Sequence, residues 1–87
     1  MDFPKTPAVA TFDRTLATLK RGDRAVIDAI DDADPIVQRL MTLGLVEGVV
    51  VERGHSAIGG DPTEFRVHGL GISLRREQAR CFSVTDA

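Results

Sequence analysis

The three side chains best suited to bind a transition metal, His55, His68 and Cys81, follow one another at intervals of thirteen positions. Metal sites are usually marked by close pairs such as Cys-x-x-Cys or His-x-x-x-His, which this spacing does not contain. We therefore predict no metal site: His68 faces solvent on a strand, His55 lies in a loop, and Cys81 is semi-buried. The alternative is a weak site in which two of them meet on adjacent strands beside Asp61 or Glu64.

The chain contains none of the short motifs that carry nucleophilic catalysis or nucleotide binding. No serine or cysteine lies in a nucleophile elbow, and no Gly-x-x-x-x-Gly-Lys-Ser/Thr loop is present. We therefore predict that the protein is not an enzyme and requires no cofactor. An arginine could still act in trans on the transferring phosphate of a partner GTPase. The candidates are Arg39 and the pair Arg75 and Arg76, although a surface or capping contact at its own helix explains Arg39 better.

Four arginines, Arg66, Arg75, Arg76 and Arg80, lie close together in sequence. Domains that bind single-stranded nucleic acid interleave such charges with aromatic side chains on which bases stack. This chain has four Phe, no Trp and no Tyr, and its formal net charge is −2. We therefore expect a solvated charged edge and no nucleic-acid binding.

The length of 87 residues suffices for one domain. Residues 1–14 contain two prolines and no hydrophobic periodicity, which predicts a flexible N-terminal arm before a domain over residues 15–87. A single cysteine cannot form an internal disulfide and is typical of a reducing compartment. No apolar run has the length of a signal peptide or a membrane span. We expect a cytoplasmic protein that does not insert into membranes.

The remaining pattern predicts a mainly β domain. A β-branched strand over residues 24–30 precedes a short helix, which Asp34 and Pro35 begin and Gly44 ends, and which carries Ile36, Leu40 and Leu43 on one face. Further strands are expected over residues 48–53, 63–68, 72–74 and 81–84, with a loop over 54–62, a three-residue turn over 69–71 and a helical turn over 75–80. Glycines that we expect to make the turns are Gly22, Gly44, Gly48, Gly60 and Gly69. About five strands, one helix inserted after the first and a helical turn before the last describe a small antiparallel SH3-like barrel.

Several fragments, in this order, resemble the FeoA family: Leu16-x-x-Leu19-x-x-Gly22, Arg39-Leu40-x-x-Leu43-Gly44-Leu45-x-x-Gly48, Gly60-Asp61-Pro62, and Val67-x-Gly69-x-x-Ile72-Ser73-Leu74-Arg75-x-Glu77-x-Ala79. The resemblance implies an SH3-like barrel and a small cytoplasmic accessory protein in Fe(II) uptake. Such a protein binds and modulates FeoB, the membrane permease with a cytosolic GTPase domain, and Fe(II) is the cargo of that system rather than a bound cofactor. The alternative is a stand-alone regulatory barrel, similar to the C-terminal domain of metal-dependent repressors, that binds a peptide or a transition metal ion.

The helix and its exit carry more apolar side chains than one face of a short helix needs. We predict a surface for the partner protein here, formed by Val37, Met41, Leu43 and Leu45, with Arg39, Arg75 and Arg76 as further candidates. The alternative is that the barrel needs all these apolar side chains to close its end. The oligomeric state, and whether the protein activates or restrains transport, are left open.

Overall fold

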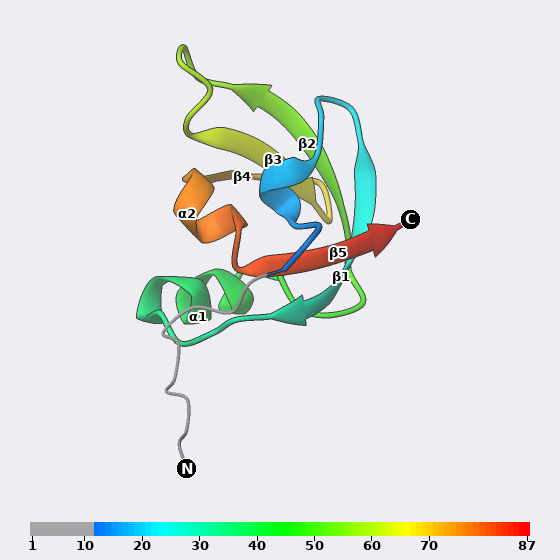
Figure 1. Ribbon diagram of the computed structural model, residues 1–87, viewed down its shortest axis with the longest axis vertical. Helices are drawn as coiled ribbons and strands as arrows, with labels where there is room; N and C mark the ends of the chain where they lie inside the picture. The colour runs from blue at the N-terminus through cyan, green and yellow to red at the C-terminus, as the bar shows by residue number, and fades with distance from the viewer. Residues whose placement is uncertain (1–11) are drawn as a thin grey trace.

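The computed structural model describes residues 12–87 as one five-stranded sheet with two short α-helices and a 3-10 turn (Figure 1). The sheet order is β4-β3-β2-β1-β5, and every neighbouring pair is antiparallel. The elements are η1 Leu16–Thr18, β1 Arg24–Ile30, α1 Pro35–Thr42, β2 Val50–Ser56, β3 Thr63–Val67, β4 Leu70–Leu74, α2 Arg76–Ala79 and β5 Phe82–Asp86. The predicted mainly β fold with five antiparallel strands is confirmed.

Strand β1, on which the curl of the sheet depends, takes part in two pairings that cover different lengths of the strand. Residues Arg24 to Val26 pair with β2, whereas the pairing with β5 continues to Ile30. The register against β5 shifts between Ile27 and Ala29, a bulge of the kind that bends a strand. On the open side, η1 and α2 contact each other between the two edge strands β4 and β5 (Figure 1).

The core lies inside this curl and is aliphatic apart from two phenylalanines and one cysteine. Alternation along β3 turns Phe65 and Val67 inward, and alternation along β5 does the same for Phe82 and Val84, as predicted. The buried apolar residues are Leu16, Leu19, Ala25, Ile27, Val37, Leu40, Leu45, Val51, Phe65, Val67, Leu74, Ala79, Cys81, Phe82 and Val84.

Helix α1 begins as the sequence predicts. A carboxylate oxygen of Asp34, the N-cap residue, accepts a hydrogen bond from the backbone N–H of Ile36 at 2.8 Å. Pro35 occupies the first helical position, where its missing N–H costs nothing and its fixed φ suits the helix. The capping hydrogen bond and the fixed φ of Pro35 stabilise the first turn of a helix that is too short to be stable by itself.

The end of α1 directs the chain back into the barrel. Gly44 has a φ of 114°, its N–H donates to the carbonyl of Met41, and the N–H of Leu45 donates to the carbonyl of Leu40. This pair of bonds is the Schellman arrangement, in which a residue just beyond the helix packs against the last turn. Leu45 is therefore fully buried, like the other apolar residues that close this end.

The hairpin between β3 and β4 has a two-residue turn, so the predicted three-residue turn over residues 69–71 is wrong. Val67 pairs directly with Leu70, and the turn consists of His68 and Gly69, with φ values of 52° and 80°. Two successive positive φ values match the twist of a two-residue hairpin, in which the first residue is usually Asn, Asp or Gly. The prediction failed because His68 was assigned to the strand. The five glycines assigned to turns all have φ between 80° and 114°.

Three strands extend further than predicted: β4 begins at Leu70 rather than at Ile72, because the turn before it is shorter, and β2 and β5 end later. Strand β2 runs to Ser56, three residues into the predicted loop, since Ser56 pairs with Thr63 and their hydroxyl oxygens lie 2.8 Å apart. A Cβ on Gly54 would lie 3.0 Å from a carboxylate oxygen of Glu64, so glycine permits the strands to approach there. Strand β5 likewise runs to Asp86 rather than to Val84.

Arg14 and Thr15, which precede η1, already belong to the barrel. Most of the predicted arm over residues 1–14 lies outside the described residues. The carbonyl of Arg14, however, accepts a hydrogen bond from the N–H of Val84, and its guanidinium forms an ion pair with Asp86 at 2.9 Å. Thr15 then forms a bridge with Ser83. The edge strand β5 is thus joined to the segment before η1.

Candidate functional site

The structure divides the predicted partner-binding residues of α1 between the core and the surface. Val37 and Leu45 are fully buried, so they are not available to a partner, and this part of the prediction is wrong. Met41 is half-buried and packs against the core, whereas Leu43 is 50% exposed. Val37 is buried because it lies three residues before Leu40 on the helix face that covers the barrel.

Two exposed apolar residues were not assigned to this surface from the sequence. Ile36 is 51% exposed and Val46 is 37% exposed. Spacing alone placed Ile36 with Leu40 and Leu43 on one face, but only Leu40 faces the core. Ile36 and Leu43 lie about two turns apart on the same side of the helix, because seven residues make about two turns. We call Ile36, Leu43 and Val46 the α1 surface.

The arginine candidates belong to two different helices. Arg39 is exposed on α1, between Ile36 and Leu43. Arg75 and Arg76 begin α2, where the side chain of Gln78 accepts from the N–H of Arg75 and the carboxylate of Asp61 accepts from the N–H of Arg76, both at 2.9 Å. Only Arg39 lies within the segment that forms the α1 surface.

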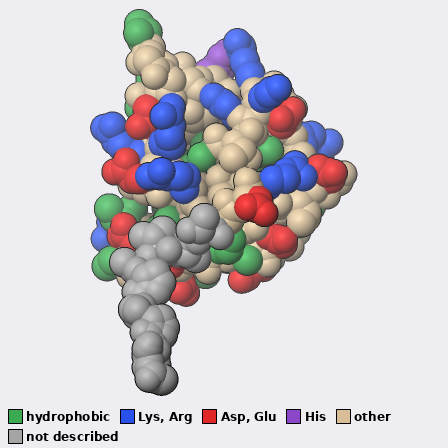
Figure 2. All heavy atoms as spheres, in the orientation of Figure 1, with side chains coloured by type: hydrophobic (Ala, Val, Ile, Leu, Met, Phe, Trp, Pro, Cys, Tyr) green, Lys and Arg blue, Asp and Glu red, His purple; other side chains and the backbone are tan. Residues whose placement is uncertain are grey.

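The basic residues clustered in sequence are also separated in space. Arg66 lies on the outer face of β3 and lines a hollow of about 570 Å³ with Arg24, Glu52 and His68, whereas Arg75, Arg76 and Arg80 lie in and beside α2. Figure 2 shows Lys and Arg side chains scattered over the visible face among Asp and Glu side chains. The four arginines therefore do not form one continuous basic groove.

The candidate metal ligands are placed on different elements. His55 is exposed on β2, with its Nε2 atom 3.4 Å from the guanidinium of Arg21, and His68 lies in the β3–β4 turn. Cys81 is buried before β5, and its thiol lies 3.5 Å from the carbonyl oxygen of Glu77. Among residues 12–87, no three His, Cys, Asp or Glu side chains are grouped in a way that could hold a metal ion.

Burial, and to a smaller extent the carboxylates of Asp31 and Asp34, raise the pKa of the Cys81 thiol. Metals bind the thiolate, so a raised pKa disfavours Cys81 as a ligand. Within the described part of the chain, no helix combines the length and apolar character that crossing a bilayer requires.

The fold and its exposed helix define a class: a small SH3-like barrel with a short, firmly capped helix that displays apolar side chains. The sequence model of the FeoA domain matches residues 14–86, and the chain belongs to the FeoA family. No curated protein matches the chain.

Solved structures of FeoA proteins share the fold. The FeoA protein of Chlorobium tepidum is 38% identical over 80% of this chain and 67% of its own, with a TM-score of 0.73. The iron(II) transport protein A of Clostridium thermocellum is 27% identical over 80% of this chain, with a TM-score of 0.74, but this match spans only 43% of that protein. FeoA of Stenotrophomonas maltophilia, an SH3 domain protein solved with zinc, is 29% identical over 82% and 88% of the two chains, with a TM-score of 0.73. A manganese-dependent transcriptional repressor, 19% identical with a TM-score of 0.75, shares the fold alone.

Proposed function

We propose that this protein is an accessory protein of ferrous iron uptake that binds the cytosolic part of a FeoB-type transporter through the α1 surface. Membership of the FeoA family supports the link to Fe(II) transport. Two relatives support it by description: one is an iron(II) transport protein A, and the other has been suggested as a ferrous iron transport activating factor. In this proposal the protein works in the cytoplasm by contact rather than catalysis, and Fe(II) is the cargo of its partner.

The exposed apolar side chains of α1 are the observation that carries the choice of surface. Ile36 and Leu43 each expose about half of their area, on a helix whose two ends are held by side-chain and backbone hydrogen bonds. A rigid helix that presents two or three apolar anchors loses little conformational entropy on binding. Polar residues, including Gln38, Arg39 and Thr42, are exposed on the same helix and can form the rim. Such a small surface suits transient binding with micromolar affinity.

The test is a pull-down of the detergent-solubilised transporter with this protein as bait, with and without guanine nucleotide. The double variant Ile36→Glu, Leu43→Glu should reduce binding at least tenfold, because burying a charged group without a partner is costly. Its circular dichroism should remain that of the wild type, since both side chains are exposed. Leu70→Glu is the matched control, because Leu70 is 57% exposed at the start of β4 and should leave binding unchanged.

Two outcomes would contradict the proposal. One is the absence of transporter binding by the wild type, and the other is binding by the double variant at wild-type strength. The same preparation tests Arg39 as a residue that acts on the GTPase. If Arg39 contacts the transferring phosphate, the wild type raises GTP turnover and Arg39→Ala abolishes that increase.

A further inference from the structure

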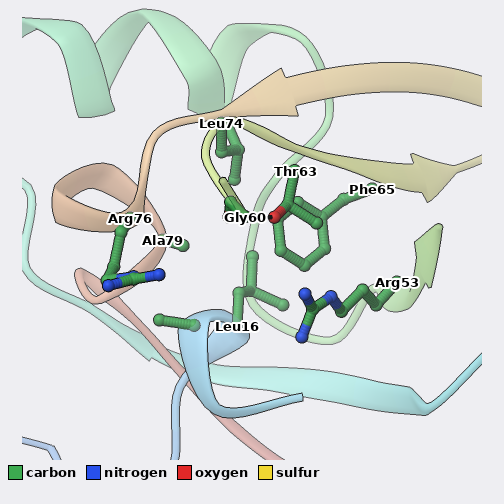
Figure 3. A pocket seen from close by; sticks show the side chains of 9 residues that line it. Leu16, Arg53, Gly60, Thr63, Phe65, Leu74, Arg76 and Ala79 are labelled. Atoms are coloured by element: carbon green, nitrogen blue, oxygen red, sulfur yellow. Dashed lines mark hydrogen bonds between the residues drawn. The ribbon is translucent and has the colours of Figure 1, made fainter. Parts of the chain in front are cut away.

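The barrel is hollowed on the side that η1 and α2 cover. A pocket of about 150 Å³ opens between these elements and β3, and Figure 3 shows its lining. Its floor consists of the buried side chains of Leu16, Phe65 and Leu74. The walls stay open because the residues there are small: Ala17, Gly60 and Ala79.

Two guanidinium groups lie beside the apolar floor of this pocket. In Figure 3 they approach from opposite sides, Arg53 from β2 and Arg76 from α2, with Leu16 between them. Arg76 is held in place by its backbone N–H, which donates to Asp61, while its side chain lies near Gly60. The guanidinium of Arg76 makes no hydrogen bond or ion pair with any other residue of the stretch 12–87 and is exposed.

Arg53 is positioned more firmly and still has an unused donor. Its two terminal nitrogens donate to the carbonyl of Leu19 and to the hydroxyl of Ser56. Its Nε is buried and has no hydrogen-bond partner among the described residues. Buried donors are nearly always satisfied, so the hydrogen bonding of the Arg53 side chain is incomplete among the described residues.

The charges around the pocket favour an anionic ligand. The carboxylate of Asp61 accepts a hydrogen bond from the backbone N–H of Arg76. The carboxylate of Glu64 lies on the other face of the sheet, near Gly54 and Gly71. Neither Arg53 nor Arg76 has a carboxylate partner within the described part of the chain. Two arginines with free donors therefore flank an apolar floor, an arrangement that suits a carboxylate attached to a small apolar group.

We propose that this pocket binds an acidic side chain, Asp or Glu, of a protein partner, with a small apolar neighbour of that residue packed on the floor. The carboxylate lies between the two guanidinium groups, and its methylene groups contact Leu16 and Phe65. A cavity of about 150 Å³ admits a group as large as benzene, which matches a carboxylate side chain and excludes a nucleotide. The apolar floor favours a peptide segment over a free inorganic anion, which would gain nothing from it.

The test uses nuclear magnetic resonance on the ¹⁵N-labelled full chain. The probes are the capped peptide acetyl-Gly-Glu-Ala-Gly-amide and its matched partner with Gln in place of Glu. The Glu peptide should cause saturable shifts at the amides of Leu16, Ala17, Gly60 and Ala79. The Gln peptide should bind at least about fivefold more weakly, because it lacks the charge.

Two arginine variants distinguish binding of the peptide in this pocket from nonspecific electrostatic attraction to the protein. Arg76→Gln should weaken binding of the Glu peptide about fivefold without unfolding the chain, because its side chain holds no other element. Arg66→Gln removes the same charge on the outer face of β3 and should leave binding unchanged.

Three results would overturn the proposal: no saturation up to about 20 mM peptide, equal losses in the Arg66 and Arg76 variants, or tighter binding of inorganic phosphate than of the Glu peptide. The measurement needs only this chain. Its failure would leave the proposed contact through the α1 surface untouched, and failure of the transporter pull-down would leave the pocket proposal untouched.

Discussion

The guanidinium of Arg53, on β2, donates a hydrogen bond to the backbone carbonyl of Leu19, which follows η1. The backbone of Arg53 binds the same region, because its carbonyl accepts from the N–H of Gly22 and its N–H donates to the carbonyl of Asp23. One residue thus joins the segment between η1 and β1 to the middle of the sheet. Without this connection, Leu16 and Leu19 would be less firmly held over the core.

Arg53→Ala should lower the free energy of unfolding by about 2 kcal/mol, because it removes charge-assisted bonds to Leu19 and Ser56. Urea denaturation monitored by circular dichroism measures the change. Arg66→Ala, on the exposed outer face, should shift stability by less than about 0.5 kcal/mol. Equal stability of the two variants would show that the Arg53 side chain does not hold η1.

Asp34→Ala should lower the free energy of unfolding by about 1 kcal/mol, because the N–H of Ile36 loses its acceptor. Asp34→Asn keeps an acceptor and should restore most of the loss. Asp32→Ala removes a carboxylate from the same segment without removing the cap, so it controls for the effect of charge near the helix terminus. A loss as large in the Asp32 variant would contradict the capping role of Asp34.

His68→Asn should raise the free energy of unfolding by about 0.5 kcal/mol, because Asn accepts positive φ more readily than other non-glycine residues and Asn-Gly favours this turn. Thermal unfolding provides the measurement. His68→Val should be destabilising by about 1 kcal/mol or more, since a β-branched side chain is strained at this φ. His55→Asn, an exposed change on β2, should give no such gain. Destabilisation by Asn at position 68 would argue that the imidazole has another role.

Cys81 should react with iodoacetamide at pH 8 at least about tenfold more slowly in the native protein than in urea, because burial raises the pKa of its thiol and limits access. Mass spectrometry follows the reaction at this single cysteine. Asp34→Asn should speed native alkylation slightly, since the Asp34 carboxylate contributes to the raised pKa, whereas Asp32→Asn should not. Native alkylation as fast as in urea would contradict the burial.

The raised pKa of Cys81 also makes stability depend on pH at the alkaline end. Above the ordinary pKa of a thiol, about 8.5, the thiol ionises more fully in the unfolded chain than in the folded one, where its pKa is raised. Its contribution to stability is therefore fully present below that pH and is lost as the pH rises through the folded pKa. Cys81→Ala should remove this part of the dependence, which denaturation midpoints between pH 8 and 10 would reveal.

Local signals in the sequence predicted the parts of the fold that depend on neighbouring residues. Asp34 and Pro35 correctly marked the start of α1, and Gly44 marked its end. Strict alternation correctly turned Phe65 and Phe82 inward. The β3–β4 turn was misplaced because a histidine at positive φ carries no strong local signal. Of the apolar residues predicted for a partner surface, Leu43 is exposed, whereas Val37 and Leu45 are buried. Ile36 and Val46 are exposed but were not among the predicted residues.

The sequence by itself determined the strand content, the capped helix and the family, because propensity, capping and motif order are local properties of the chain. Only the tertiary structure decided which side of α1 faces solvent, because that depends on how the helix rests on the barrel. It also decided that Arg53 and Arg76 share one pocket with Leu16, although they belong to separate segments. The curl of the sheet brings those segments together. The spacing of Arg53, Arg76 and Leu16 along the chain does not predict that they line the same pocket.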